Sequence, residues 1–270
     1  MNKKLALIIA AVIIAAATFI IIGVKTGSRA SLNKGRPLSM TSLLNKAKEL
    51  EGRGDLLGTR NAYQELASSF PNAPEADSWE KKAEELNIKL LFSSIVTPKS
   101  ILYKIKTGDT LNKIAREHQT TVELLMKSNN LTGDRIIPGR ELKVWIAPFS
   151  IVVDKSQNIL ILKSDEDVIK TYNVATGLNN CTPVGTFRIV NKLKDPTWFK
   201  AGAVVPADSS ENILGSRWMG FNLAGYGIHG TTEPETIGKQ ATQGCIRMVN
   251  YDVEELYAIV PEGTEVTIVD

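Results

Sequence analysis

A long apolar run near the N-terminus constrains this chain most. Leu5 to Val24 is a stretch of 20 residues without a charged side chain. An α-helix needs about 20 such residues to cross the hydrocarbon core of a bilayer. A cleaved signal peptide has a shorter apolar region that ends at small residues, whereas this run continues beyond Ala15-Ala16-Ala17 into Phe19-Ile20-Ile21-Ile22. We therefore expect residues 1–24 to be an uncleaved transmembrane anchor, with cleavage as the alternative.

Basic residues flank both ends of this run, so the charge distribution does not decide its orientation. Residues 25–39 are polar and contain Gly, Ser and Pro, which is typical of a linker. The rest of the 270-residue chain is long enough for more than one domain. The net charge of +3 is small and the basic residues are scattered, which argues against nucleic-acid binding.

Residues 40–92 carry apolar side chains at helical spacing, for example Ala62, Tyr63, Leu66 and Phe70. This part resembles a helical hairpin of the tetratricopeptide type. One such unit cannot bury its own apolar face. Two interpretations stay open: a short helical spacer that packs on a neighbouring domain, or a module that binds a protein partner.

Residues 101–146 predict a compact unit with the order βααβ. Residues 103–106 alternate like a strand, Thr110 and Thr121 are placed to cap two short helices, and residues 141–145 return as a strand. The pattern Y-K-I-K-x-G-D-T-L-x-x-I-A, followed by N-N-L, I-P-G and L-K-V, resembles the LysM family. The resemblance implies a glycan-binding domain for peptidoglycan or chitin. It places the binding groove near five residues that also serve as turns and caps: Gly108, Asp109, Thr110, Ile136 and Ile137.

From residue 150 the pattern changes to successive short strands, at about 151–153, 159–162, 168–174, 186–190 and 265–269. One helix is predicted from Asn250, read as its cap, to Val260. Residues 150–270 therefore form a mostly β domain, and the chain as a whole is a multidomain protein.

Two residues in this domain indicate cysteine chemistry. Cys245 follows Gly244, which leaves room for a substrate to approach the thiol, and His229 precedes Gly230. A histidine can remove the thiol proton, and the thiolate is the nucleophile. The two cysteines of the chain fit neither a disulfide framework nor a zinc site.

The patterns G-I-H-G-T at 227–231, I-G at 237–238 and T-Q-G-C-I-R-M at 242–248 resemble the L,D-transpeptidase (YkuD-type) catalytic domain. Further matches lie at 182–187, 214–218 and 263–266. The resemblance implies Cys245 as nucleophile, His229 as base and the Gly230 carbonyl as the group that orients the imidazole. It also implies an oxyanion hole of backbone N–H groups from Gln243, Gly244 and Cys245. No metal or organic cofactor is required.

Five side chains have open roles. Arg247 either lowers the thiol pKa, holds a substrate carboxylate or forms a structural salt bridge. Tyr226 and Trp218 are candidates for lining the substrate cleft, although aromatic side chains in a β domain are more often part of the core. Gln243 stands where many family members have His. Cys181 is interpreted as structural, with a redox partnership to Cys245 as the alternative.

The resemblance implies a peptidoglycan L,D-transpeptidase that takes an acyl group from a tetrapeptide stem, releases D-alanine and passes the acyl group to an amine. Two alternatives are an L,D-carboxypeptidase, in which water is the acceptor, and a non-catalytic peptidoglycan-binding envelope protein. The expected partners are stem peptides, glycan strands and the membrane. The catalytic part is expected outside the cytoplasm, in the periplasm or cell wall.

Overall fold

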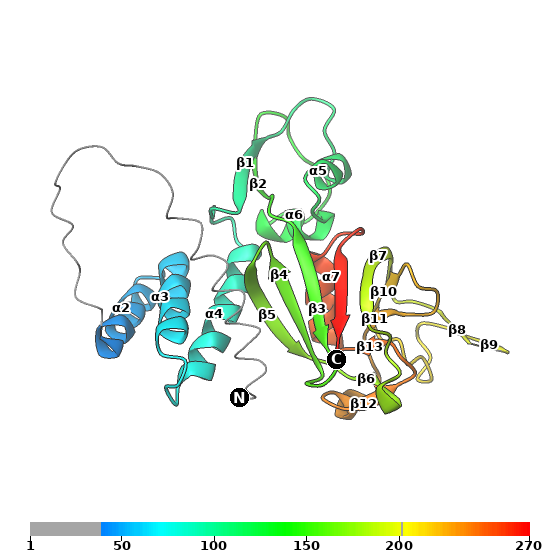
Figure 1. The fold of residues 1–270 in the computed structure, drawn as a ribbon. Coiled ribbons are helices and arrows are strands. Elements are labelled where there is room, and N and C mark those ends of the chain that lie inside the picture. Colours follow the sequence, from blue (N-terminus) through cyan, green and yellow to red (C-terminus); the bar gives the residue numbers. More distant parts are fainter. Residues whose placement is uncertain (1–38, 201) are drawn as a thin grey trace, which may run out of the picture. The chain divides into compact units, whose positions relative to one another are not determined.

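The computed structural model describes residues 39–200 and 202–270 (Figure 1). The α-helices are α2 (Met40–Gly52), α3 (Leu56–Ser69), α4 (Ala76–Leu91), α5 (Leu111–Glu117), α6 (Val122–Ser128) and α7 (Asn250–Ile259). The first strands are β1 (Ser100–Lys104), β2 (Glu141–Trp145), β3 (Phe149–Asp154), β4 (Ile159–Ser164), β5 (Asp167–Asn173), β6 (Thr176–Gly177) and β7 (Gly185–Lys194). The others are β8 (Trp198–Lys200), β9 (Ala203–Val205), β10 (Arg217–Phe221), β11 (Gly227–His229), β12 (Gln240–Thr242), β13 (Ile246–Arg247) and β14 (Glu265–Val269). Two short 3-10 helices are η1 (Leu178–Asn180) and η2 (Pro234–Thr236).

The C-terminal part is built on an eight-stranded sheet with the order β13-β11-β10-β7-β14-β3-β4-β5. Its pairs are antiparallel except β14 with β3 and β11 with β13, which are parallel. Helix α7 packs against the sheet (Figure 1), and its Val253, Leu256 and Ile259 are buried in the same core as the sheet residues Ile151 and Leu162. The expected mostly β domain is therefore present. Four of the five predicted strands lie within observed strands, and the fifth, at 168–174, extends one residue beyond the end of β5.

The predicted cap of α7 is wrong. Val249 occupies the N-cap position, and Asn250 is the first residue of the helix. The Asn250 amide instead bonds to Ser216 and Thr231, which lie in loops outside its own helix.

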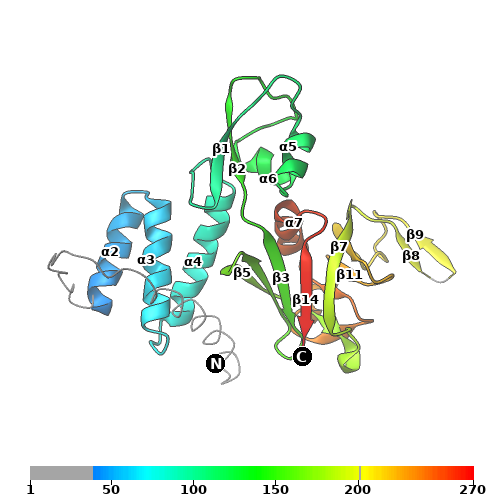
Figure 2. The same cartoon turned by 45° about the horizontal axis from the view of Figure 1, so that its top comes forward.

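The helical segment contains three helices, α2, α3 and α4, which lie side by side (Figure 2) and share one apolar core. Helix α4 also contacts β5, the edge strand of the eight-stranded sheet. Asn87 donates from Nδ2 to Ile169 O at 3.0 Å, and Glu84 Oε1 accepts the Thr171 N–H at 3.0 Å. An uncovered edge strand is a site of aberrant pairing. The helices thus pack on a neighbouring domain and cover this edge, while a protein partner for them stays a prediction.

The predicted βααβ unit consists of β1, α5, α6 and β2 and has its own apolar core. Strand β1 begins at Ser100, three residues before the predicted start, because its pairing with β2 extends to Trp145. The hydroxyls of Thr110 and Thr121 accept hydrogen bonds from the first turns of α5 and α6, so both predicted caps are confirmed.

Buried Lys143 on β2 connects this unit to the end of α4. Its Nζ donates to Leu90 O at 2.6 Å and to Ser93 O at 2.8 Å. Burial lowers the pKa of Lys143 to about 8, and carbonyl groups at the C-terminal end of a helix favour a nearby cation. Leu124 of α6 is also part of the apolar core of the large sheet.

No helix within the described ranges 39–200 and 202–270 is long and apolar enough to span a bilayer. The expected anchor, residues 1–24, lies outside these ranges.

Candidate active site

The site is formed where the parallel strands β11 and β13 lie side by side at one edge of the sheet. Ile228 pairs with Ile246, and both side chains are fully buried in the core. Because successive side chains on a strand point to opposite faces, His229 and its register partner Arg247 face away from that core. Cys245 comes directly before β13, two residues from Arg247, which places the thiol on the same side of the sheet as His229.

His229 is 2 % exposed, and its Nδ1 lies 2.7 Å from Gly230 O. A carbonyl oxygen only accepts, so Nδ1 carries the proton and Nε2 has a free lone pair. Burial lowers the pKa of His229 to about 4. The hydrogen bond to Gly230 raises this pKa because it favours the cation, and the Arg247 charge lowers it. The imidazole is therefore neutral at neutral pH, with Nε2 able to accept a proton.

Trp218 covers one side of this imidazole. The two residues are register partners on β10 and β11, and their rings are stacked with centroids 6.0 Å apart. The indole N–H of Trp218 donates to Asn191 Oδ1 at 3.0 Å, which fixes the ring. The structure thus shows Trp218 in contact with the candidate base, while a contact with substrate stays a prediction.

Cys245 ends the turn that follows β12, and this turn requires Gly244. Gly244 has φ +120°, and a Cβ at this position would lie 2.7 Å from the Tyr226 ring. The Cys245 thiol is partly exposed and donates to Gly225 O at 3.5 Å. The Tyr226 ring therefore lies against the turn at Gly244, next to the partly exposed thiol.

Burial raises the pKa of the Cys245 thiol, against the smaller lowering by a hydrogen bond from the Gly227 backbone and by the Arg247 charge. With His229 neutral as well, the two groups rest as a thiol and an imidazole. Proton transfer then accompanies attack on the substrate, as in general-base catalysis.

The hydroxyl of Thr242 holds the turn that carries the predicted oxyanion hole. It donates to Cys245 O at 2.7 Å and accepts the Gly244 N–H at 3.1 Å. The Gly244 N–H therefore already has a partner in this structure. The roles of the Gln243, Gly244 and Cys245 N–H groups in binding an oxyanion stay predictions.

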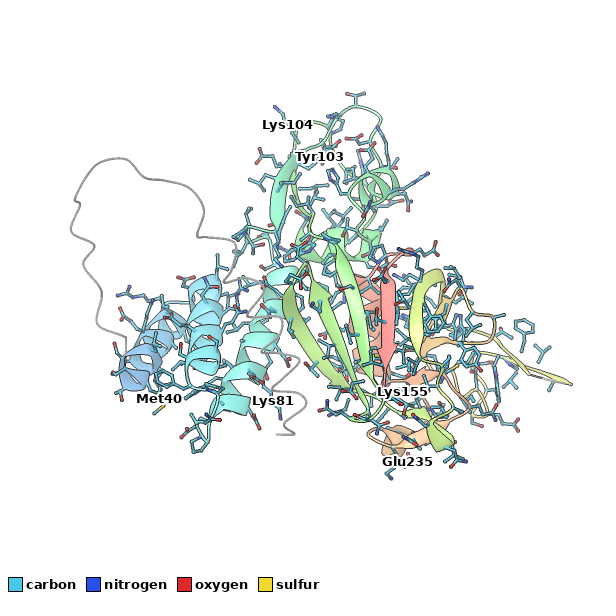
Figure 3. The ribbon with its side chains drawn as sticks, viewed as in Figure 1. Met40, Lys81, Tyr103, Lys104, Lys155 and Glu235 are labelled. Carbon is cyan, nitrogen blue, oxygen red and sulfur yellow. The ribbon has the colours of Figure 1, made fainter. Side chains whose placement is uncertain are left out.

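Arg247 is 5 % exposed and connects the site to η2, where Glu235 is labelled in Figure 3. Its guanidinium lies 2.6 Å from Glu233 Oε2 and 3.0 Å from Thr236 Oγ1, while its buried Nε has no partner among the described residues. The salt bridge is thus present. The same charge lowers the pKa of both His229 and Cys245.

We predict that Arg247→Met moves the pH–rate profile to higher pH. Loss of the cation raises the pKa of the base and of the nucleophile together. The free energy of unfolding should fall by only about 1 kcal/mol, because the remaining Glu233 carboxylate is half exposed and keeps its hydration. Rates of thiol acylation between pH 4 and 10, with urea unfolding, measure both effects.

Glu233→Gln is the matched control for Arg247→Met. It keeps the cation but leaves it buried without its carboxylate, so it should cost roughly 3 kcal/mol of stability without raising either pKa. A KM increase in Arg247→Met with an unchanged pH profile would instead assign Arg247 to a substrate carboxylate.

The predicted glycan-binding residues lie at the turns and the first helix cap of the βααβ unit, and their role in glycan binding stays a prediction. The Asp109 carboxylate accepts from the Lys106 N–H at 2.8 Å, from Lys113 Nζ at 3.0 Å and from the hydroxyl of Tyr103, labelled in Figure 3, at 2.8 Å. The backbone bond from Lys106 is the largest cause that lowers the pKa of Asp109 to about 2, followed by the bonds from Lys113 and Tyr103. Ile137 is 57 % exposed. Of the other three, Gly108 has a positive φ, Thr110 caps α5 and Ile136 is partly buried.

Cys181 is exposed and lies beside the catalytic turn. Its thiol is 3.9 Å from Thr242 O. Lys155, labelled in Figure 3, follows β3 and donates to Thr182 O at 2.8 Å and to Asn180 O at 3.3 Å, which holds the loop around Cys181. Both the structural and the redox interpretation of Cys181 stay predictions.

The sequence reasoning missed the partners of the two central residues. Gly225 accepts from the thiol, Trp218 stacks on the base, and Asn250 binds the chain directly after Gly230. The sequence showed Trp218 as a candidate cleft residue and Asn250 as a candidate helix cap, but it carries no information on which loops meet.

Two family models match the chain. Residues 148–268 match the YkuD model, described as an L,D-transpeptidase catalytic domain, and residues 103–145 match the LysM domain.

Among curated proteins, YkuD of Bacillus subtilis (strain 168), provisionally named an L,D-transpeptidase, is 34 % identical over 175 residues, which cover 62 % of this chain and 98 % of that protein. YqjB of the same strain, named in the same way, is 40 % identical over 126 residues, covering 44 % of this chain and 70 % of that protein. Among solved structures, a mutant L,D-transpeptidase of Enterococcus faecium is similar with 24 % identity and a TM-score of 0.39; the match covers 45 % of this chain and 50 % of that one.

Proposed function

The chain belongs to the YkuD-type L,D-transpeptidase family, and we propose that it cross-links peptidoglycan by acyl transfer through Cys245. The observation that carries this proposal is the bond from His229 Nδ1 to Gly230 O, because it leaves Nε2 as a base on the face that also carries the thiol. The LysM match supports peptidoglycan as the substrate polymer.

The first half-reaction forms an acyl-enzyme. The Cys245 sulfur attacks the carbonyl carbon of the third residue of a tetrapeptide stem while His229 Nε2 takes the thiol proton. The tetrahedral intermediate collapses as the bond to the terminal D-alanine breaks. His229 returns the proton to the departing amine, and the enzyme holds a thioester.

The second half-reaction transfers the acyl group. An amine of another stem, or of an envelope protein, attacks the thioester carbonyl, and His229 takes the proton from the nitrogen. The thiolate leaves and is reprotonated.

Incubation of the chain with purified disaccharide-tetrapeptide, followed by mass spectrometry, tests this function. Cross-linked dimers with loss of one D-alanine are expected. Trimmed tripeptides alone would establish an L,D-carboxypeptidase, and unchanged substrate would indicate a non-catalytic binding protein.

Localisation and anchoring form part of the same proposal. Stem peptides lie outside the cytoplasmic membrane, and the uncharged run at 5–24 has the length of a membrane span. We place residues 40–270 in the periplasm or cell wall, with the LysM unit raising the local concentration of glycan at the active site. A reporter fused after Asp270 that is active only in the cytoplasm would overturn this placement.

We predict that Ile137→Glu weakens binding to insoluble peptidoglycan several-fold and leaves turnover of soluble stems unchanged. The side chain is exposed at the proposed groove, where a carboxylate opposes contact with the apolar face of a sugar ring. Co-sedimentation with purified peptidoglycan measures the binding. A point variant is preferable to a deletion, because Lys143 and Leu124 attach the LysM unit to the rest of the chain.

Leu102→Glu is the matched control, since Leu102 on β1 is 54 % exposed and lies outside the predicted groove. Equal loss of binding in both variants would show that added negative charge, rather than the groove, controls the interaction.

A further inference from the structure

The Asn250 side chain connects two loops next to the base and does not cap its own helix. Its Oδ1 accepts the Thr231 N–H at 3.0 Å and the Ser216 N–H at 3.2 Å, and its Nδ2 donates to Thr231 O at 3.0 Å. One amide therefore satisfies both backbone polar groups of Thr231, two residues after His229.

Both loops approach this amide so closely that only glycine fits beside it. A Cβ would lie 2.2 Å from Asn250 Oδ1 at Gly230 and 2.3 Å at Gly215, which also has φ +61°. Contacts this short are excluded for a real side chain. The Asn250 amide thus excludes a side chain at both positions, and at Gly215 the backbone N of Thr231, also 2.3 Å away, does so as well.

Asn250 acts where the support of the sheet ends. Strand β11 stops at His229, whose carbonyl accepts the Met248 N–H at 2.9 Å, and the Gly230 N–H donates to Arg217 O at 3.1 Å. The next peptide group, between Gly230 and Thr231, has no strand partner on its N–H side. Its N–H is held by Asn250.

A trans peptide is planar, and its C=O and N–H point in opposite directions. Fixing the Thr231 N–H therefore fixes the direction of the Gly230 carbonyl, which accepts from His229 Nδ1. We propose that Asn250 is a positioning residue that sets the tautomer and orientation of His229 through the rigid Gly230–Thr231 peptide.

This inference rests on the proposed role of His229 as base, but its central test does not require turnover. The chain has only two histidines, His229 and His118. Long-range proton–nitrogen spectra of the full-length chain labelled with ¹⁵N-histidine report the tautomer of each ring. In the wild type at pH 7.5 we expect His229 as the Nδ1–H tautomer; the Nε2–H tautomer in the wild type would overturn the proposal.

Asn250→Ala should convert His229 to a mixture of tautomers and leave His118 unchanged. With stem peptide as substrate, kcat should fall about 10- to 100-fold while KM stays within about twofold, since the base is misoriented and the binding surface is intact. A folded Asn250→Ala variant in which His229 shows only the Nδ1–H tautomer and kcat is normal would overturn the proposal.

Two further variants separate positioning from folding. Asn212→Ala also removes a buried amide with three backbone hydrogen bonds, to Pro196, Pro206 and Leu214, and should change neither tautomer nor kcat. Asn250→Asp keeps the acceptor for the Thr231 N–H and should retain the Nδ1–H tautomer even if Asn250→Ala does not fold. Loss of that tautomer in a folded Asn250→Asp variant would contradict the inference. If the wild type showed the expected Nδ1–H tautomer but did not turn over stem peptide, only the proposed function would be contradicted.

Discussion

Cys245→Ala is expected to abolish both cross-link formation and thioester formation, with the fold unchanged. The reaction proceeds through a covalent bond to sulfur, so no residual covalent path remains without it. The thiol donates only one long hydrogen bond, 3.5 Å to Gly225 O, and its removal should leave stability within about 1 kcal/mol. Mass spectrometry of the protein after incubation with disaccharide-tetrapeptide, or with a carbapenem as acylating probe, detects the adduct directly.

Cys181→Ser is the control for this experiment. Serine keeps a donor near Thr242 O, so the loop beside the catalytic turn is preserved. We expect one adduct in Cys181→Ser and none in Cys245→Ala. An adduct that persists in Cys245→Ala would move the nucleophile elsewhere and withdraw the mechanism.

The fold was predicted best where local chemistry determines it. The Thr110 and Thr121 caps and the alternation at 103–106 specify a βααβ unit within some 45 residues of sequence, and both caps are satisfied inside that unit. The catalytic sheet was predicted as separate strands only. Its order places β14 between β7 and β3, and such long-range pairing leaves no periodicity in the sequence.

The irregular part of the catalytic domain was not predicted. The hairpin of β8 and β9 carries exposed Phe199 and Val204, and the strands β11 to β13 have two or three residues each. Such short strands carry too few residues for a recognisable alternation. Their positions follow from contacts with distant segments.

Within the site, too, residues marked by a local pattern were predicted and residues placed by distant contacts were not. Cys245 and His229 were identified because glycine accompanies each of them in a recognisable pattern. Asn250 was assigned to a helix cap on its local sequence, yet its amide serves Thr231 and Ser216, 19 and 34 residues earlier. Tertiary contacts outcompete the local cap here, and a single sequence without coordinates does not record them.

His229→Gln is expected to lower the acylation rate by roughly 10²- to 10⁴-fold, which is the contribution of a positioned general base. Glutamine keeps a hydrogen-bonding side chain of similar size but cannot accept the thiol proton. In the wild type, the rate should hold from neutral pH down to near pH 4, since burial lowers the pKa of His229 to about 4 and the base stays unprotonated above it. Stopped-flow acylation measured from pH 3.5 to 9 tests both statements, with His118→Gln as the control for the other histidine.

The same pKa predicts a stability difference whose sign is fixed by linkage. In the unfolded chain a histidine takes up its proton near pH 6.5, whereas folded His229 does so only near pH 4. As the pH falls between these values the unfolded state binds more protons, and the folded state loses stability. Wild type should therefore lose roughly 2–3 kcal/mol more than His229→Gln between pH 7.5 and 4.5, measured as the difference in free energy of unfolding in urea. If the two proteins lost stability in parallel, His229 would have an ordinary pKa in the folded state, and the neutral resting base would have to be replaced by an imidazolium–thiolate pair.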